Sequence, residues 1–350
     1  MSEYTATLAT VSRACPLCGH GDRSRVLVEE AYDPGRMGQF AFASRKLPEY
    51  MHYRLLVCAE CDLLYASPAP APETLDEAYR TAAYDSAAES ACAARTYAGL
   101  VRRILGRLPG RNGALDIGAG DGAFLKELLA LGFTDVAGVE PSAAPIAAAD
   151  STIRPLIGHC PFRAHDFPAG QFSLITCFQT LEHVYDPLQL CRDACGLLKD
   201  GGAMLIVVHN RQALSARLLG RRSPIFDIEH LQLFSRRSAQ ALLRKAGFGQ
   251  IGSSVVLNRY RASYWLRLLP LPGRLKQRAI AAANALAVGR LPITLPAGNL
   301  AIWGYKTGAE QENCEVVEPH HVGWTSSPSS AHETDWKSIL RVRAGAEAGS

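Results

Sequence analysis

The sequence lacks the features that would place a protein in a membrane or export it. Its apolar stretches are interrupted by Pro, Gly or Arg well before about eighteen residues, the length expected of a membrane-spanning helix. The first residues, MSEYTATLAT, contain no basic segment followed by an apolar core, and no internal repeat is visible. We therefore expect a soluble, cytoplasmic protein. Its 350 residues, 48% of them hydrophobic, suffice for an α/β core and more than one domain.

Acidic residues are scarce in one part of the chain. Residues 199–306 hold 17 Lys and Arg against 3 Asp and Glu, whereas residues 1–198 hold 17 against 23. This concentration of positive charge favours an anionic substrate, or it solvates a surface, and both interpretations stay open. The N-terminal region is not basic, which disfavours nucleic-acid binding there.

Cysteine is present in ten copies, but without a secretion signal these do not suggest a disulfide framework. Two CxxC pairs, Cys15 with Cys18 and Cys58 with Cys61, provide four thiolates that can close a tetrahedral Zn²⁺ site. A closed site of this kind has no open coordination position. We expect it to stabilise a segment too small for its own core and to play no part in catalysis.

Residues 114–140, ALDIGAGDGAFLKELLALGFTDVAGVE, predict a ligand site. An apolar strand at 114–117 runs into a loop containing Gly118, Gly120 and Gly122, and a helix follows from about 123 to 131. Glycines at such a turn let a ligand approach the backbone and the helix N-terminus. Glu140 ends the next strand, where a carboxylate can bind the hydroxyls of a ribose.

Two ligands fit this glycine loop. Gly118, Gly120 and Ala123 also satisfy the dinucleotide pattern GxGxxA, so NAD is an alternative. Asp116, inside the first strand, and Asp121, in the loop, would repel a pyrophosphate and suit a cation. S-adenosylmethionine carries ammonium and sulfonium charges and fits better.

At this point the sequence resembles the class I S-adenosylmethionine-dependent methyltransferases, through LDIGAGDG and GVE. The resemblance continues through FSLITCFQTLEHVYDP, GLLKDGGAMLIVVHN, EHLQLFS and LLRKAGF, in the same order. It implies an α/β, Rossmann-like fold with a mostly parallel sheet and an antiparallel last strand. The N-terminal segment is similar to the zinc-ribbon-like domain that precedes the catalytic domain in many bacterial methyltransferases.

The resemblance also implies the cofactor site. The methionine part would face Asp116 and the glycine loop, and the ribose would face Glu140. After the third strand relatives often place an acid near the adenine, but this chain has GHC at 158–160, and Asp166 is the nearest acidic candidate. The expected cofactor-binding residues are Asp116, Gly118, Ala119, Gly120, Asp121, Glu140, Pro141, Asp166, Phe178 and Gln179.

Methyl transfer to a hydroxyl needs a base, and histidine has a suitable pKa. His183, in LEHVYDP, is the first candidate, and His230, in EHLQLFS, is the second. A histidine that only hydrogen-bonds its loop is the alternative for each. His209, at a strand end, could face the acceptor.

The expected division of the chain is a zinc-ribbon-like domain (1–66), a helical linker or lid (67–110), a methyltransferase domain (111–308) and a disordered tail (309–350). Residues 259–296 form an insertion before the last strand, read as a substrate lid or as an amphipathic segment that contacts an anionic membrane. The expected activity is O- or C-methylation of a sugar, lipid or secondary metabolite. The alternatives are an NAD-linked oxidoreductase and a non-catalytic binding module.

Overall fold

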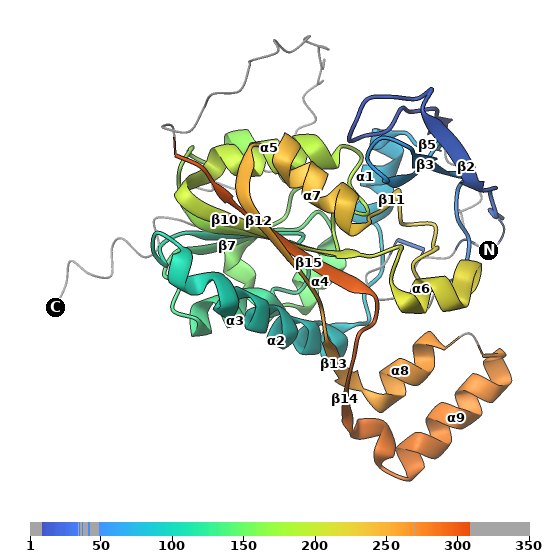
Figure 1. Cartoon of the computed structure of the whole chain (residues 1–350). Helices are drawn as coiled ribbons and strands as arrows, with labels where there is room; N and C mark the ends of the chain where they lie inside the picture. The colour runs from blue at the N-terminus through green and yellow to red at the C-terminus, as the bar shows by residue number, and fades with distance from the viewer. Residues whose placement is uncertain are drawn as a thin grey trace.

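A computed structural model describes residues 9–33, 35, 37, 41–42, 49–269 and 271–308 (Figure 1). The predicted disorder of the tail concerns residues outside these ranges. The centre of the fold is a seven-stranded sheet. In spatial order its strands are β12 (Phe248–Val255), β15 (Asn299–Lys306), β10 (Leu198–His209), β9 (Phe172–Phe178), β6 (Ala114–Ile117), β7 (Val136–Val139) and β8 (Ile157–Gly158).

The strands of this sheet are apolar because both faces are covered. Every residue of β6, β7 and β9 is buried, as expected of parallel strands between two layers of helices. β10, β9, β6, β7 and β8 pair in parallel, whereas β15 pairs antiparallel with both β10 and β12. The predicted Rossmann-like architecture with an antiparallel last strand is confirmed.

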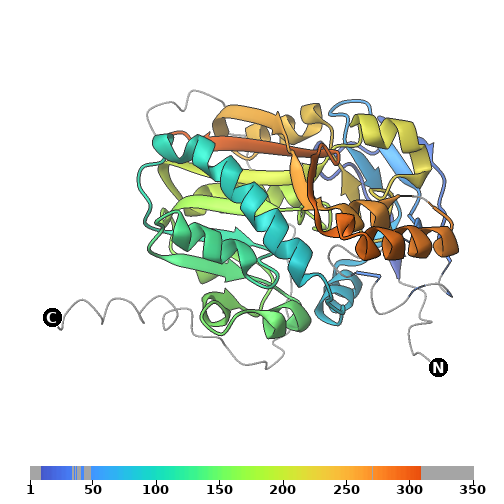
Figure 2. The same cartoon turned by 90° about the horizontal axis from the view of Figure 1, so that it is seen from below.

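Helices cover the two faces of the sheet. α2 and α3 lie together on one face and α5 and α7 on the other (Figures 1 and 2). The helices are α1 (Pro72–Arg80), α2 (Ala87–Ile104), α3 (Ala123–Ala130), α4 (Ala143–Ala148), α5 (Pro187–Leu197), α6 (Leu214–Leu219), α7 (Arg236–Lys245), α8 (Ala262–Leu268) and α9 (Gly273–Ala285).

The N-terminal ribbon is built onto the catalytic fold. Its four-stranded sheet has the order β11-β4-β3-β2, and β11 (Gln232–Leu233) comes from the EHLQLFS segment far along the chain. Tyr65 and Leu63 of the ribbon pack in the same apolar cluster as the buried face of the large sheet. The remaining ribbon strands are β1 (Thr10–Val11), β2 (Ser24–Val28), β3 (Leu55–Cys58), β4 (Leu64–Ala66) and β5 (Ala69–Pro70).

The insertion is a small unit of its own at one end of the molecule. Two antiparallel strands, β13 (Asn258–Arg261) and β14 (Pro292–Leu295), connect α8 and α9 to the rest of the fold (Figure 1). Neither helix has a fully buried residue among those that the structure describes. Within the described ranges, none of the helices combines the length and the apolar character needed to cross a bilayer.

Candidate active site

A single continuous cavity of about 1960 Å³ lies at the carboxyl ends of the parallel strands. The loops after β6, β7, β8, β9 and β10 each contribute to its wall, through Gly118, Glu140, His159, Gln179 and His209. Ligands of open α/β sheets bind at this edge, where the strand order reverses between β6 and β9. The loops after these strands therefore converge on one cavity.

The glycine loop after β6 leaves open space for a ligand. Gly118, Gly120 and Gly122 all have positive φ angles, +79°, +56° and +70°. A Cβ on Gly118 would lie 2.3 Å from Thr180 Oγ1, so this position is closed by the protein itself. A Cβ on Gly120 would meet nothing within 4 Å. Gly120 thus exposes its backbone to the cavity, as a cofactor-binding loop requires.

Asp116 places a buried carboxylate beside this loop. It is 3% exposed, and its Oδ1 accepts a 2.6 Å hydrogen bond from Thr176 Oγ1. The two residues are register partners on β6 and β9, which explains the contact. Because burying a carboxylate is costly without compensation, a cationic ligand in the adjoining cavity suits this position.

Glu140 directly follows β7 and hydrogen-bonds to the glycine loop. Its Oε2 accepts from the Gly120 amide at 2.9 Å, and its Oε1 accepts from the Ser142 amide at 2.9 Å. Burial raises the pKa of this carboxyl group, although these amide hydrogen bonds oppose the shift. A carboxylate has about four acceptor sites. Two amides therefore leave capacity for the hydroxyls of a ribose.

Two of the expected cofactor residues lie away from the cavity wall. Asp121 Oδ1 accepts hydrogen bonds from Ser90 Oγ at 2.7 Å and from the Ala123 amide at 3.1 Å. It fixes α2 to the start of α3, and it does not line the cavity. Asp166 does not line it either, whereas Phe162 and Arg163 do. The roles of Asp121 and Asp166 in cofactor binding stay predictions.

Phe178 and Gln179, at the end of β9, form part of the cavity wall. The Phe178 ring lies 4.3 Å from that of Tyr97 and 4.8 Å from that of Phe124, measured between centroids. Gln179, at φ +52°, accepts a 2.8 Å hydrogen bond from Tyr97 Oη. Ala119 and Pro141, also expected at the cofactor, line the same cavity. The predicted residues at 119, 141, 178 and 179 are therefore brought together.

His183 lines the cavity with a defined orientation. Its Nδ1 lies 3.1 Å from the Glu229 carbonyl oxygen and 2.8 Å from Tyr79 Oη, and Tyr79 Oη donates to the same carbonyl at 3.0 Å. Burial raises the pKa of Tyr79, which keeps its hydroxyl protonated. An Nδ1–H directed at the carbonyl leaves the lone pair on Nε2. Nε2 is then the basic nitrogen.

Two further histidines stand in a row with His183. The ring of His230 lies 5.0 Å from that of His183 and 4.9 Å from that of His209. His230 Nδ1 lies 2.9 Å from the Ile225 carbonyl oxygen. Burial lowers the pKa of His209 to about 4, so this ring is neutral at pH 7. All three line the cavity, but their chemical roles stay predictions.

Positive charge does not line the cavity in the way expected for an anionic acceptor. Among the described residues of 199–306, no Lys or Arg contributes to the wall. The acids that do contribute include Asp116, Glu140 and Glu229. Arg80 and Arg163, from the first half of the chain, also line it. The carboxylates suit a cationic methyl donor, and the charge of the acceptor stays a prediction.

Hydrogen bonds to main-chain carbonyls hold the loops that carry His183 and His230. The Leu231 amide donates to the Glu182 carbonyl at 2.8 Å, and Gln232 Nε2 donates to the Val184 carbonyl at 2.7 Å. Arg13 of the ribbon donates to the Tyr185 and Leu231 carbonyls, both at 2.9 Å. Burial of the guanidinium lowers the pKa of Arg13 to about 10. The ribbon therefore positions the loops of His183 and His230.

Glu182 makes the stability of the protein depend on pH. It is fully buried, and burial raises its pKa to about 7, against about 4.3 in an unfolded chain. Between these values the folded state binds one more proton, so stability falls as the pH rises. We expect Glu182→Gln to exceed the wild type in urea unfolding by only about 1 kcal/mol at pH 5 and by about 3.5 kcal/mol at pH 8.

Glu77→Gln is the control for Glu182→Gln. Glu77 is exposed on α1 and pairs with Arg80 one turn away, an interaction worth little in water. Its substitution should change stability equally little at both pH values. If Glu182→Gln were equally stable relative to wild type at pH 5 and pH 8, the raised pKa would be refuted.

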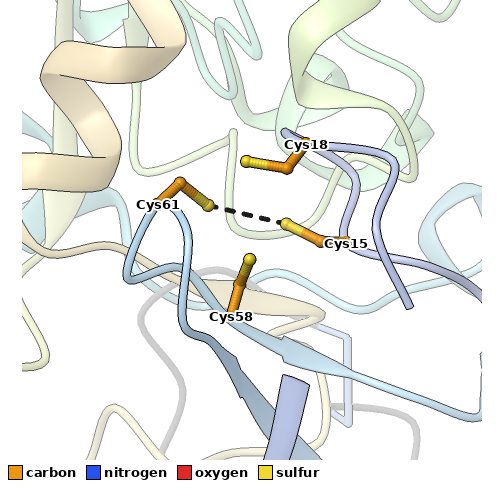
Figure 3. A group of neighbouring side chains, drawn as sticks. All are labelled: Cys15, Cys18, Cys58 and Cys61. Atoms are coloured by element: carbon orange, nitrogen blue, oxygen red, sulfur yellow. Dashed lines mark hydrogen bonds between the residues drawn. The ribbon is translucent and has the colours of Figure 1, made fainter. Parts of the chain in front are cut away.

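The four cysteines of the CxxC pairs form one cluster (Figure 3). Their Sγ atoms all lie within 4.8 Å of one another, and those of Cys15 and Cys61 are 3.6 Å apart. A disulfide needs about 2.05 Å, whereas four sulfurs about 2.3 Å from a central Zn²⁺ lie about 3.8 Å apart. The Cys61 thiol lowers the pKa of Cys15 to about 6 by donating a hydrogen bond to it. The donor set and the spacing fit zinc.

Some residues that build the site cannot be recognised from the sequence. Arg13 stands two residues before the first cysteine pair, and nothing in its surroundings marks its contacts with loops more than 170 residues away. Tyr79 lies in the stretch expected to form a helical linker or lid, where an aromatic residue is more often part of the core than of a site. Thr176 and Thr180 gave no signal, because their roles come from the pairing of β9 with β6.

The cavity and its loops fall in a region with known relatives. Residues 89–251 match the profile of a family described as "Methyltransferase domain". The ubiquinone biosynthesis O-methyltransferase of Marinobacter nauticus is 34% identical over 117 residues, which cover 29% of this chain and 46% of the relative. That of Bordetella avium is 31% identical over 121 residues, covering 33% and 49%. The chain spans about half the length of these curated relatives.

Solved structures of similar chains include a SAM-dependent methyltransferase from Archaeoglobus fulgidus. It is 16% identical, with a TM-score of 0.42 over 61% of this chain and 94% of the other. Neither the NAD-linked nor the non-catalytic alternative finds support in these comparisons. The matched region runs from α2 to β12 and contains the glycine loop, Glu140 and both candidate bases. Residues 89–251 are therefore similar to a methyltransferase domain, in agreement with the family resemblance noted in the sequence.

Proposed function

We propose that this protein transfers a methyl group from S-adenosylmethionine to a hydroxyl oxygen of a largely apolar small molecule. The observation that carries the proposal is one cavity that holds both a carboxylate-lined loop and an oriented histidine. Asp116 and Glu140 are placed to hold the donor, and His183 is the base candidate on the acceptor side. The similarity to proteins named as O-methyltransferases supports oxygen as the acceptor atom.

The cofactor fits the glycine loop because Gly120 leaves open space and Asp116 offers a buried negative charge. When bound, S-adenosylmethionine supplies a methyl group on a positively charged sulfur. The chain would align the acceptor within the cavity, and alignment accounts for much of the acceleration of such a transfer. His183 would accept the hydroxyl proton at Nε2, while the Glu229 carbonyl and Tyr79 hold the ring.

The cavity volume supports a bulky acceptor. Typical ligand sites measure about 300–1,000 Å³, and this cavity is about twice the upper value. Its far wall consists of apolar residues of the insertion, among them Leu266, Leu268 and Val288. A lipid-like acceptor accounts for both the volume and the lining better than a free sugar.

We further propose that the cysteine cluster holds one structural Zn²⁺. Four sulfur ligands leave no position for substrate, so the ion stabilises the ribbon and takes no part in the transfer. Four reduced thiols also agree with a cytoplasmic location, which we include in the proposal.

The cofactor assignment is tested by calorimetric titration of the purified chain. S-adenosylhomocysteine should bind with a stoichiometry of about one, and NAD should give no heat of binding. Binding of NAD in the absence of S-adenosylhomocysteine binding would overturn the proposal and favour an oxidoreductase. Acceptors are then screened by the mass gain of one methyl group.

His183→Asn is expected to lower methyl transfer about a hundredfold, since a positioned base contributes about 10²–10⁴. Affinity for S-adenosylhomocysteine should stay unchanged. The rate is measured with the best acceptor of the screen. His165→Asn is the control, because the His165 side chain is 78% exposed and does not line the cavity. Near-normal turnover of His183→Asn would remove the base role.

A further inference from the structure

Exposed apolar side chains gather on one end of the molecule. The structure describes fourteen large hydrophobic residues that are exposed, and ten of them lie on α6 or within residues 257–296. Leu218 on α6 is 76% exposed, and Leu275 and Leu286 of the insertion are 53% and 73% exposed. Single exposed leucines are ordinary, but a gathered set marks an interaction surface. We call α6 together with residues 257–296 the docking face.

The docking face is also strongly basic. Residues 257–296 contain seven Lys and Arg and no Asp or Glu. Arg217, Arg221 and Arg222, at and after α6, are exposed as well. None of these cations lines the cavity. Within 257–296, Arg267 is half-buried and pairs with Glu89. Lys276 is also half-buried, whereas the other five are exposed to the surroundings. The positive charge of this half of the chain thus belongs to an outer surface.

The cavity opens on the same face. Leu269, Leu291 and Ile293 line the cavity and are also 39–55% exposed, so they form part of its rim. Leu219 of α6 contributes to the same wall. The insertion and α6 lie at the same end of the molecule in both views (Figures 1 and 2). Whatever binds the docking face therefore lies against the entrance to the active site.

The charge and the apolar residues of the docking face indicate what kind of partner binds it. A second copy of the same face would bring like charges together without compensating acids, which is unfavourable. An anionic lipid surface complements both features, because its head groups attract Lys and Arg and its acyl region accepts leucines. Tyr264 and Trp265 are half-buried at the rim, where they pack against the buried ring of Tyr260, and such rings suit a boundary between lipid and water.

We propose that the docking face binds the surface of an anionic lipid bilayer and that the acceptor enters the cavity from that bilayer. The enzyme lies on the membrane through short helices and side chains. The acceptor is then a membrane-borne molecule with an apolar portion and a reactive hydroxyl. This second part rests on the proposed function and names the source of its substrate.

The first test is flotation of the full chain with vesicles. We expect binding to vesicles of equal parts phosphatidylcholine and phosphatidylglycerol, and much weaker binding to phosphatidylcholine alone or at high salt. The double substitution R274E/R278E on α9 should lower binding at least about tenfold. R236E/R244E on α7 is the matched control, since it changes the charge equally at exposed sites outside the docking face. It should bind like the wild type.

A second measurement reports on the entrance itself. Trp265, whose Nε1 donates to the Ile293 carbonyl at 3.0 Å, lies at the rim. Its fluorescence should be quenched by vesicles whose acyl chains carry bromine, and the quenching should be lost in W265F. This measurement does not depend on whether the charge variants fold.

Several results would overturn the proposal. They are absence of wild-type binding to anionic vesicles, equal loss of binding in the two charge variants, and quenching that persists in W265F. Calorimetry with S-adenosylhomocysteine is run on the same samples. Protein that binds this ligand but no vesicles refutes only the docking face, whereas protein that binds vesicles but not the ligand refutes only the proposed function.

Discussion

Replacing Cys58 with Ser is expected to unfold the N-terminal ribbon and to abolish methyl transfer with it. The strands of the ribbon have two to five residues, too few to hold a core without a cross-link. Binding of a structural zinc contributes about 10–16 kcal/mol in small domains, and removing one thiolate forfeits most of it. The loss exceeds the stability of an ordinary domain.

The effect should reach the active site through Arg13. This residue stands two positions before Cys15, and its guanidinium donates to the carbonyls of Tyr185 and Leu231. Without an ordered ribbon these hydrogen bonds are lost, and the loops of His183 and His230 lose a shared anchor. We therefore expect the proposed zinc site to affect catalysis only by positioning these loops, because the cysteine cluster lies outside the cavity.

The measurements are zinc content, the urea midpoint and the rate of trypsin cleavage within residues 9–66. Cys92→Ser is the matched control, because Cys92 lies on α2 outside the cluster and should leave all three unchanged. A purified wild type without zinc, or a Cys58→Ser variant with normal zinc content and trypsin resistance, would refute the structural zinc site.

Replacing Gly120 with Val is expected to lower the affinity for S-adenosylhomocysteine at least about a thousandfold, or about 4 kcal/mol. Gly120 has φ +56°, and a Cβ there meets no protein atom within 4 Å. Its side chain would therefore enter the open cavity where the loop receives the cofactor. Part of the cost is backbone strain, which any L residue incurs at this φ.

Gly170→Val separates strain from obstruction. Gly170 has φ +66°, and a Cβ there also meets nothing within 4 Å, but it lies on a turn outside the cavity. Both variants should lose about 1–2 kcal/mol of stability in urea unfolding. Calorimetry should show a loss of ligand affinity in Gly120→Val but not in Gly170→Val. Equal affinities would move the cofactor away from this loop.

Much of the cofactor half of the site could be predicted from the sequence. The glycine loop, Asp116 and Glu140 belong to local patterns, in which a strand, a tight turn and a helix follow one another within a few residues. Such patterns fix their own geometry, so the strand at 114–117 has the predicted bounds. The cysteine pairs are recognisable for the same reason, because each turn presents its two sulfurs locally.

Other parts of the site, on the cofactor side as well as on the acceptor side, could not be predicted in this way. Asp166 and Asp121 were chosen by their nearness in sequence, yet neither lines the cavity, and their side chains serve other contacts. The basic charge of residues 199–306 suggested an anionic acceptor, but a count of charges does not tell which side of a helix faces a cavity. In the structure none of these cations lines the cavity.

The sequence by itself indicated the Rossmann-like sheet, the glycine loop and the two cysteine pairs, because each strand, turn or pair depends on residues that are near neighbours in the chain. Only the tertiary structure decided that β11 completes the ribbon sheet, that Arg13 anchors both histidine loops, and that the cavity opens on the basic insertion. These features join residues up to 219 positions apart. Their contacts follow from the packing of the whole chain, which no local pattern specifies.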